Sequence, residues 1–338
     1  MQLVIHRGSH EIGGSCIELT TRNSRIILDA GLPLVTASRG AFDPMSIDGK
    51  PVADLIADGT IPNVPGLFQD GPEVDAVLLS HSHLDHAGLI HLTRPSIPVY
   101  TSAGTSKMML AGALFGRQLS LDRSRHRPIE SQQTFQVGDF RVTPYAVDHS
   151  SFGSMAFLIE ADGKKVLYSG DIRTHGRKPG MAKALLQAVG GQSVDTLLME
   201  GTHFGSEKTM GKTEHELEEE IVSLVQLAAS IVLACFSPID VDRLVTYYRA
   251  ARRSGRVFVV DLYTAFVMHL VSAEAAIPKP TAENGIRVFF NRSVLNKHNE
   301  KIEGLFSASR IELETILSAP AEYLMVFRPS MIQLDFQG

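Results

Sequence analysis

His81-Ser82-His83-Leu84-Asp85-His86 follows directly after the apolar run Ala76-Val77-Leu78-Leu79-Ser80. The apolar run predicts a buried strand, and the polar residues after it predict a turn at the end of that strand. Imidazole nitrogen and carboxylate oxygen are the ligand atoms that suit zinc and related divalent ions. His81 and His83 alternate along the turn and can share one face, while Asp85 and His86 can hold a second ion. The stretch therefore predicts a metal site that needs partners from elsewhere in the chain.

Three other segments end in residues that can complete such a site. One strand-like segment leads to His149, another ends in Asp171, and a third ends in Asp29 before a glycine. An isolated aspartate at Asp29 would be a turn former, but beside the histidines we favour a carboxylate that orients a ligand imidazole. A polar loop that happens to be rich in histidine is the alternative interpretation. The joint occurrence of these segments favours a metal site.

The composition predicts a globular protein of one large or two ordinary domains. The 338 residues are 44% hydrophobic and 20% charged, and none of the apolar runs is long enough to cross a membrane. The N-terminus predicts a strand and not a signal peptide. Cys16 and Cys235 lie far apart in apolar runs, so we expect no disulfide, no membrane association and a reducing cytoplasm.

The net charge of −5 argues against a generally basic surface but leaves nucleic acid open, because a local basic patch can offset it. Three runs are candidate patches, and each is more often a solvated surface run than a ligand site. These runs are residues 123–127, 173–178 and 252–256.

The order of the predicted elements indicates two kinds of architecture. Up to about residue 200, antiparallel strands with helices outside predict two sheets packed between helical layers, with metal ligands on loops at one end. After Glu200, strands alternate with helices, which predicts a parallel sheet with right-handed crossovers. The predicted helices of this second part cover residues 213–229, 241–253, 263–273 and 293–305.

The order Asp29, residues 81–86, His149 and Asp171 resembles the four signature motifs of the metallo-β-lactamase superfamily. The resemblance implies two zinc ions and a hydroxide between them that attacks phosphorus. Manganese would accept the same ligands. The implied ligands are His81, His83 and His149 for one ion and Asp85, His86 and Asp171 for the other, with Asp171 bridging. The residues assigned to catalysis are Asp85, which would orient the hydroxide, His86 and Glu200.

The segment after residue 200 resembles the inserted β-CASP cassette of the nucleic-acid-processing branch, of the ribonuclease J type. The matching sequence lies at residues 200–205, 238–243 and 256–261. The resemblance implies an α/β protein, with a four-layer αββα sandwich in residues 1–205 and a parallel α/β cassette in residues 206–338. It also implies a nuclease that acts on single-stranded RNA held by charge and shape.

Several residues carry weaker expectations. Glu200 matches the acidic residue of the first cassette motif, which implies a proton-transfer or orienting role, although a carboxylate that caps the next turn is the alternative. Ser150, Ser151 and Thr202 could donate hydrogen bonds to a phosphate, but turn or surface residues are at least as frequent. The family's two later histidine motifs have no match before Gly338, so we expect an incomplete chain, or a short variant with one weakened metal site.

Two other functions compete with the nuclease. A hydrolase of small esters, lactones or thioesters would keep the fold and the metal centre, but a small substrate does not need a second domain over the site. A non-catalytic scaffold in an RNA-processing assembly is the other, and the intact set of six ligand positions argues against it. The sequence does not determine the oligomeric state.

Overall fold

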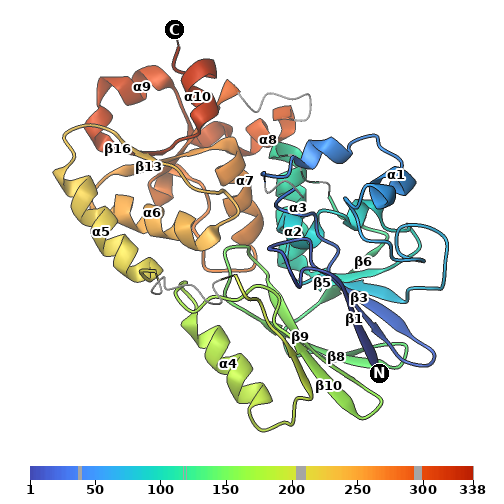
Figure 1. The fold of residues 1–338 in the computed structure, drawn as a ribbon. Coiled ribbons are helices and arrows are strands. Elements are labelled where there is room, and N and C mark those ends of the chain that lie inside the picture. Colours follow the sequence, from blue (N-terminus) through green and yellow to red (C-terminus); the bar gives the residue numbers. More distant parts are fainter. Residues whose placement is uncertain (37–39, 117, 119, 203–210, 293–298, 338) are drawn as a thin grey trace. The chain divides into compact units, whose positions relative to one another are not determined.

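The computed structural model of the chain describes residues 1–36, 40–116, 118, 120–202, 211–292 and 299–337 (Figure 1). The chain forms two compact units. Unit 1 comprises Met1–Thr174 and Lys178–Lys208, and unit 2 comprises His175–Arg177 and Thr209–Gly338. The sequence places a boundary after residue 205, and its assignment of the two parts to a metal-binding domain and a cassette stays a prediction.

The first sheet of unit 1 has its strands in chain order. The strands are β1 (Gln2–Arg7), β2 (Cys16–Thr20), β3 (Arg25–Leu28), β4 (Ala76–Leu78), β5 (Val99–Ser102) and β6 (His126–Ile129). β1 to β3 are antiparallel, and β3 to β6 are parallel. The apolar segments at residues 2–6 and 14–20 predict a starting hairpin, and the antiparallel pair of β1 and β2 confirms it. The sequence did not predict β6, because this edge strand contains a proline and charged residues instead of an apolar run.

The second sheet of unit 1 has the order β11-β10-β9-β8-β7. Its strands are β7 (Phe135–Val137), β8 (Phe140–Ala146), β9 (Met155–Ala161), β10 (Lys164–Tyr168) and β11 (Thr196–Leu198). The pairs from β7 to β10 are antiparallel, as predicted, and β11 adds to β10 in parallel. β8 and β10 are separated by β9 and run in the same direction. The segments that carry His149 and Asp171 therefore leave the sheet at the same end of its strands.

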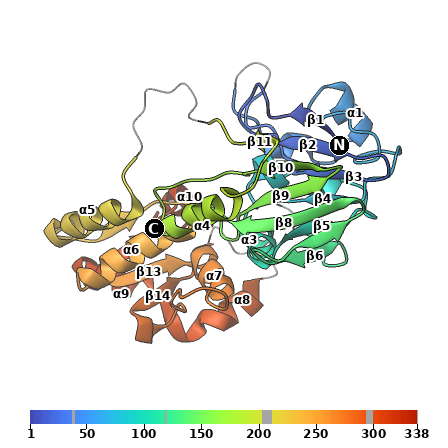
Figure 2. The same cartoon turned by 90° about the horizontal axis from the view of Figure 1, so that it is seen from below.

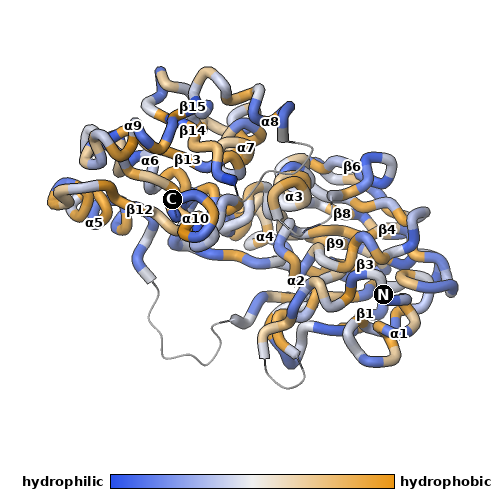
Figure 3. Tube along the Cα trace, turned by 90° about the horizontal axis from the view of Figure 1, so that it is seen from above, coloured by the Kyte–Doolittle hydropathy of each residue, from blue (hydrophilic) through white to orange (hydrophobic). Residues whose placement is uncertain are grey.

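The two sheets pack face to face over a shared core. Leu19 and Leu28 from the first sheet and Phe140 and Phe157 from the second are fully buried in it. The outer face of the first sheet packs on α1 (Val52–Ala57) and α3 (Ala103–Phe115), and the outer face of the second packs on α4 (Pro179–Val189) (Figure 2). Hydrophobic colours mark strands such as β9 (Figure 3). The predicted four-layer sandwich is therefore confirmed.

Two helices of unit 1 differ from the sequence expectation. α2 (Leu84–Ala87) begins within the metal-ligand stretch, with His83 in extended conformation at its N-cap. The sequence of residues 87–92 predicts a helix that starts at Ala87. Ala87–Leu92 instead holds the end of α2 and a short 3-10 helix, because Gly88 follows α2 directly. The sequence also missed α4, whose apolar face covers β8 to β10.

Unit 2 contains a five-stranded sheet in which all pairs are parallel, as predicted. In sheet order the strands are β12 (Val232–Ala234), β16 (Tyr323–Val326), β13 (Val257–Asp261), β14 (Ile286–Phe289) and β15 (Arg310–Ile311). The helices are α5 (Glu214–Leu227), α6 (Val241–Arg253), α7 (Leu262–Val271), α8 (Asn299–Phe306), α9 (Leu313–Ser318) and α10 (Pro329–Leu334). Residues 293–298, where we expected the start of α8, lie outside the described residues. His298, the chain's last histidine, is among them.

Short 3-10 helices occupy several connections. They are η1 (Pro44–Ile47), η2 (Ile90–Leu92), η3 (Ala282–Asn284), η5 (Ser307–Ser309) and η6 (Pro320–Glu322). Cys16 is buried and Cys235 is exposed, and both are free thiols, as expected. None of the helices formed by the described residues is both long and apolar enough to cross a membrane.

α5 and α6 of unit 2 are joined by buried ion pairs. Thr213 and Glu216 form the predicted capping box at the start of α5. Glu218 on α5 is fully buried and accepts hydrogen bonds from Arg177 Nη2, at 2.6 Å, and from Arg253 Nη1, at 3.0 Å. A buried carboxylate requires such partners, because its desolvation is costly without them. The pair with Arg253 therefore joins α5 to α6, and the pair with Arg177 joins α5 to the segment His175–Arg177.

Candidate metal centre

The predicted metal ligands of unit 1 lie at the ends of three strands. Residues 81–86 follow β4 and enter α2, His149 follows β8, and Asp171 follows β10. The turn before Asp171 depends on Gly170, which has φ +55° and lies so close to Ser80 that a Cβ there would be 2.9 Å from the Ser80 Cβ. The sheets thus bring together residues up to 90 positions apart in the sequence, from His81 to Asp171.

Two sets of ligand atoms converge at this place. His81, His83, His149 and Asp171 each offer one atom within 4.8 Å of the others, and so do His81, Asp85 and His86. Asp171 reaches towards both sets. Its Oδ2 lies 3.7 Å from His81 Nε2 and 3.6 Å from His149 Nε2, while its Oδ1 lies 3.2 Å from His86 Nε2. All six residues that the sequence nominated as ligands therefore lie in one cluster.

The donors fit a divalent cation. Among the described residues, Nε2 of His81 is completely buried and has no hydrogen-bond partner. A buried nitrogen without a partner is costly, so a lone pair aimed at other ligand atoms indicates a site for a cation. Imidazoles and carboxylates in this combination suit zinc, manganese or iron better than calcium.

Asp29 is hydrogen-bonded to His86 directly and is linked to His81 through Ser80, while its expected role in orienting ligand histidines stays a prediction. It is fully buried, with φ +57°, and its Oδ2 accepts a hydrogen bond from Nδ1 of His86 at 2.7 Å. The same oxygen accepts the hydroxyl of Ser80 at 2.7 Å, and the Ser80 oxygen lies 3.0 Å from Nδ1 of His81. Because the Ser80 proton is directed to Asp29, His81 donates its Nδ1 proton to Ser80 and keeps the Nε2 lone pair for a metal.

Two partners of Asp29 were not identified from the sequence. Ser80 also donates its backbone N–H to Asp29 Oδ1 at 2.7 Å, and Tyr168 donates its phenolic hydroxyl to Oδ2 at 2.5 Å. The only signal in the sequence was their position: Ser80 directly precedes His81, and Tyr168 ends the strand that leads to Asp171. Nothing in the sequence shows that they share a carboxylate.

The electrostatics of the cluster keep most of its imidazoles neutral. Burial, and then the neighbouring imidazoles, lower the pKa of His81 well below its ordinary value, and burial together with His83 lowers the pKa of His149 to about 3. Burial alone would lower the pKa of His86, but hydrogen bonds to Asp171 and Asp29 raise it well above the ordinary value. Neutral imidazole is the form that binds a metal, so His81 and His149 are ready to do so at neutral pH.

The other predicted residues lie at different distances from the ligands. Glu200 accepts a hydrogen bond from the backbone N–H of Ile172 at 2.7 Å, so it holds the residue after Asp171 and is absent from both ligand sets. Ser150 Oγ lies 3.4 Å from His83 Nε2. Ser151 is buried and shares a hydrogen bond with Ser82, and Thr202 is exposed. Their roles towards a substrate stay predictions.

Buried arginines interrupt two of the three candidate basic patches. Arg125 is buried and donates to the carbonyl oxygens of Ile97 and Ile90, and Arg256 is buried and donates to those of Val225 and Ala228. These two arginines are structural, because their side chains satisfy the carbonyl groups at the ends of turns and helices. Two of the runs therefore do not form continuous surface patches.

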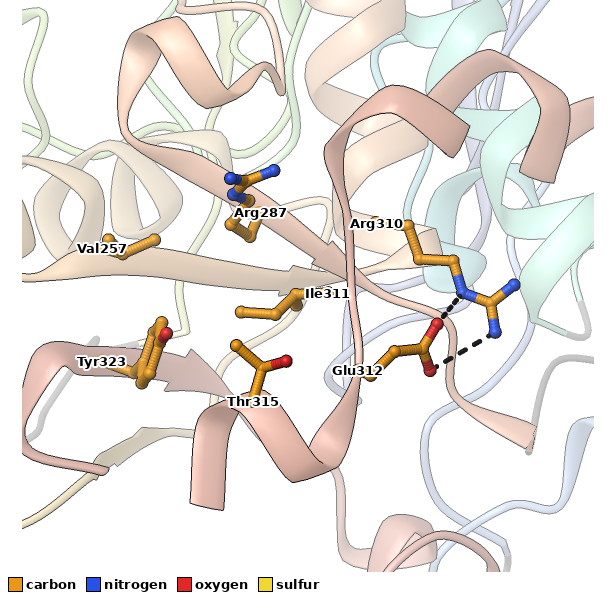
Figure 4. A pocket seen from close by; sticks show the side chains of 7 residues that line it. All are labelled: Val257, Arg287, Arg310, Ile311, Glu312, Thr315 and Tyr323. Carbon is orange, nitrogen blue, oxygen red and sulfur yellow. Dashed lines mark hydrogen bonds and ion pairs between the residues drawn. The ribbon is translucent and has the colours of Figure 1, made fainter. Parts of the chain in front are cut away.

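Unit 2 holds a separate cavity of about 360 Å³ beside the N-terminal ends of its strands (Figure 4). Its lining consists of Val257, Arg287, Arg310, Ile311, Glu312, Thr315 and Tyr323. The one carboxylate in it, Glu312, forms an ion pair with Arg310 at 2.7 Å. This cavity contains no set of metal ligands, so the candidate for hydrolytic chemistry is the cluster in unit 1.

The comparisons with known proteins agree with the fold. A family model described as a beta-lactamase superfamily domain matches residues 46–235, which is more than half of the chain. A crystal structure of a protein of unknown function from Enterococcus faecalis V583 superposes with a TM-score of 0.74 at 22% identity, covering 98% of this chain and 78% of that one. At this identity the match shows the fold alone.

Curated relatives extend the match into unit 2. An RNase J-like protein of Methanocaldococcus jannaschii is 27% identical over 276 residues, covering 78% of this chain and 58% of the relative. A ribonuclease J of Mycolicibacterium smegmatis is 30% identical over 226 residues, covering 61% of this chain and 37% of the relative. The chain thus spans less than two thirds of the length of either relative. The family model, the sandwich fold and these relatives show that the chain belongs to the metallo-β-lactamase superfamily, in its β-CASP branch.

Proposed function

We propose that this chain is the metal-binding part of a nuclease that hydrolyses phosphodiester bonds in RNA. The observation that carries the proposal is the convergence of two ligand sets, with one oxygen of Asp171 directed to each. Curated relatives named as ribonucleases support RNA as the substrate. We further propose that unit 2 is the β-CASP cassette and that the substrate is single-stranded.

The two sets would hold two divalent ions, which we propose to be zinc, with manganese as an alternative. Bound there, two cations would lower the pKa of water and neutralise charge that develops on a phosphodiester. We propose that the set His81, His83, His149 and Asp171 holds the first ion. The second ion would be held by Asp85 and His86 of the other set together with Asp171, whose Oδ1 lies 3.2 Å from His86 Nε2.

The chain's own residues prepare this chemistry. Asp29 holds His86 directly and His81 through Ser80, so both imidazoles present Nε2 to the centre of the cluster. Asp85 lies at the edge of the second set, with its Oδ2 3.7 Å from His86 Nε2, where a carboxylate can accept a proton from an attacking water. Glu200 fixes the backbone after Asp171, which favours an orienting role over proton transfer.

Both cysteines are free thiols, which supports the predicted reducing cytoplasm. An RNA substrate is consistent with that compartment. A hydrolase of small esters or lactones would use the same centre. The relatives named as ribonucleases favour the nuclease, and the assay below separates the two.

The test is cleavage of end-labelled single-stranded RNA, and of DNA with the same sequence, in added zinc or manganese. We expect RNA to be cut, and we expect Asp85→Ala to abolish cutting while the circular dichroism spectrum is retained. Asp70→Ala removes an exposed carboxylate away from the cluster and serves as the matched control. Cutting that survives Asp85→Ala would contradict the assignment. Turnover of lactones without any cutting of RNA or DNA would favour the small-molecule hydrolase.

A further inference from the structure

Asp148 and Arg173 lie next to two of the proposed metal ligands. Asp148 directly precedes His149, and Arg173 follows Asp171 by two residues. The side chains are almost completely buried, with 1% of the Asp148 side chain and 11% of the Arg173 side chain exposed. Neither residue was singled out from the sequence as part of the site, and the run that contains Arg173 was interpreted as a surface patch.

The segment after Asp171 is bound to Asp148 at three points. Nε of Arg173 donates to Oδ1 of Asp148 at 2.9 Å, and the backbone N–H of Arg173 donates to the Asp148 carbonyl oxygen at 2.8 Å. The backbone N–H of Lys178 donates to Oδ2 of Asp148 at 3.0 Å. One buried aspartate therefore joins the end of β8 to the loop that follows β10.

This connection bears on the geometry of the ligands. His149 and Asp171 come from different strands, and their ligand atoms, Nε2 and Oδ2, lie 3.6 Å apart. If the two loops were not connected, their side chains would lose conformational freedom when a cation binds, and this entropy loss would weaken the affinity for the cation. A loop tied to the residue beside His149 has already lost this freedom.

We propose that Asp148 and Arg173 are positioning residues that hold His149 and Asp171 at ligand distance before a divalent cation binds. Replacing residues that fix the orientation of metal ligands typically lowers metal affinity by about 10- to 100-fold. Asp148 and Arg173 would act in this way through the backbone next to His149 and Asp171. The inference rests on the proposed function only for the presence of a metal centre, and it does not require that the substrate is RNA.

The test measures zinc affinity by competition with a chromophoric chelator, with circular dichroism to confirm folding. We expect Asp148→Asn and Arg173→Gln each to weaken zinc binding by about tenfold or more. The double variant is expected to be little weaker than either single variant, because both changes remove the same contact. Arg173→Lys, which keeps the charge, is expected to recover part of the affinity.

The matched control is the pair Glu18 and Arg25. It also lies in unit 1, with Nε and Oε1 2.8 Å apart and side chains 12% and 13% exposed, but it is not among the ligand sets. Glu18→Gln is expected to lower the melting temperature without changing zinc affinity. A purely structural role of Asp148 and Arg173 would give the same result.

Amide hydrogen exchange on the metal-free wild-type protein gives a second test that needs no folded variant. We expect the N–H groups of Arg173 and Lys178 to exchange slowly, because both already donate to Asp148. Protection that develops only after zinc is added would overturn the proposal. Wild-type zinc affinity in folded Asp148→Asn and Arg173→Gln would also overturn it, and so would a wild-type protein that binds no metal. Tight zinc binding without RNA cleavage would contradict the proposed function alone.

Discussion

The phenolic oxygen of Tyr168 lies 2.5 Å from Oδ2 of Asp29, although 139 positions separate the two residues in the sequence. Burial first, and then the Asp29 charge, raise the pKa of Tyr168 well above its ordinary value, so the phenol keeps its proton and donates it. Asp29 in turn accepts from His86 and Ser80. One carboxylate thereby connects the first sheet, the second sheet and two of the candidate metal ligands.

Tyr168→Phe is expected to weaken zinc binding by about tenfold and to lower the free energy of unfolding by about 2 kcal/mol, because Asp29 loses a donor while it remains buried. Zinc competition and urea unfolding measure the two effects. Tyr145→Phe is the control, since Tyr145 is also buried and its hydroxyl bonds to none of the described residues. Equal zinc affinity in both variants would show that the Tyr168 hydroxyl does not support the ligands.

Ser80→Ala is expected to change the tautomer of His81. Without the Ser80 oxygen, Nδ1 of His81 loses its acceptor, so the proton distributes between the two ring nitrogens. Nitrogen-15 NMR of the histidine rings measures the populations in the metal-free protein. Ser24→Ala, which removes a buried hydroxyl bound to Asp139 N, is the control and should leave the His81 signals unchanged. Unchanged signals in Ser80→Ala would contradict the proposed hydrogen-bond direction.

Gly31→Ala is expected to displace the turn that carries Asp85 and His86. A Cβ at Gly31 would lie 1.6 Å from the Asp85 carbonyl oxygen, so one of the two backbones must move. We expect a loss of about 3 kcal/mol of unfolding free energy together with weaker zinc binding. Gly180→Ala meets no atoms within 4 Å and lies at the start of α4, so its stability should stay within about 1 kcal/mol of wild type. Equal stability of the two variants would refute the close approach.

Glu218→Gln is expected to destabilise unit 2 in a pH-dependent way. The burial of Glu218 opposes its charge, but hydrogen bonds from Arg177 and Arg253 outweigh burial and lower its pKa below the ordinary 4.5. A lowered folded-state pKa contributes stability above the unfolded value, and this contribution is lost as the pH falls through the folded-state value. The wild type should therefore be more stable than Glu218→Gln by about 3 kcal/mol at pH 7, and the difference should shrink below about pH 4.5.

Thermal melts of both proteins between pH 3 and pH 7 measure this difference. Glu219→Gln is the control, because Glu219 pairs with the same Arg253 but is half exposed, so its removal should cost much less stability than that of Glu218. A gap between wild type and Glu218→Gln that widens in acid would have the wrong sign for this mechanism.

Local sequence patterns predicted those helices and strands in which apolar residues recur regularly along the segment. The predicted helix at residues 241–253 agrees with α6 (Val241–Arg253), and the strand that the apolar residues 257–261 predict agrees with β13 (Val257–Asp261). The same patterns failed for β6, which is polar. They also placed the helix after the metal-ligand stretch too late, because Asp85 and His86 face the cluster and interrupt the apolar pattern of α2.

The candidate metal ligands could be nominated from the sequence because residue type and spacing alone carry ligand chemistry, and the structure places all six in one cluster. Their supporting partners were not visible. Ser80, Tyr168 and Asp148 are ordinary residues whose importance comes from partners 51, 139 and 25 positions away in the sequence. A sequence pattern reports whether a side chain is buried, since burial repeats with the local geometry of a helix or strand. It does not report which distant polar group that side chain meets, because sheet pairing and packing over the whole chain determine that contact.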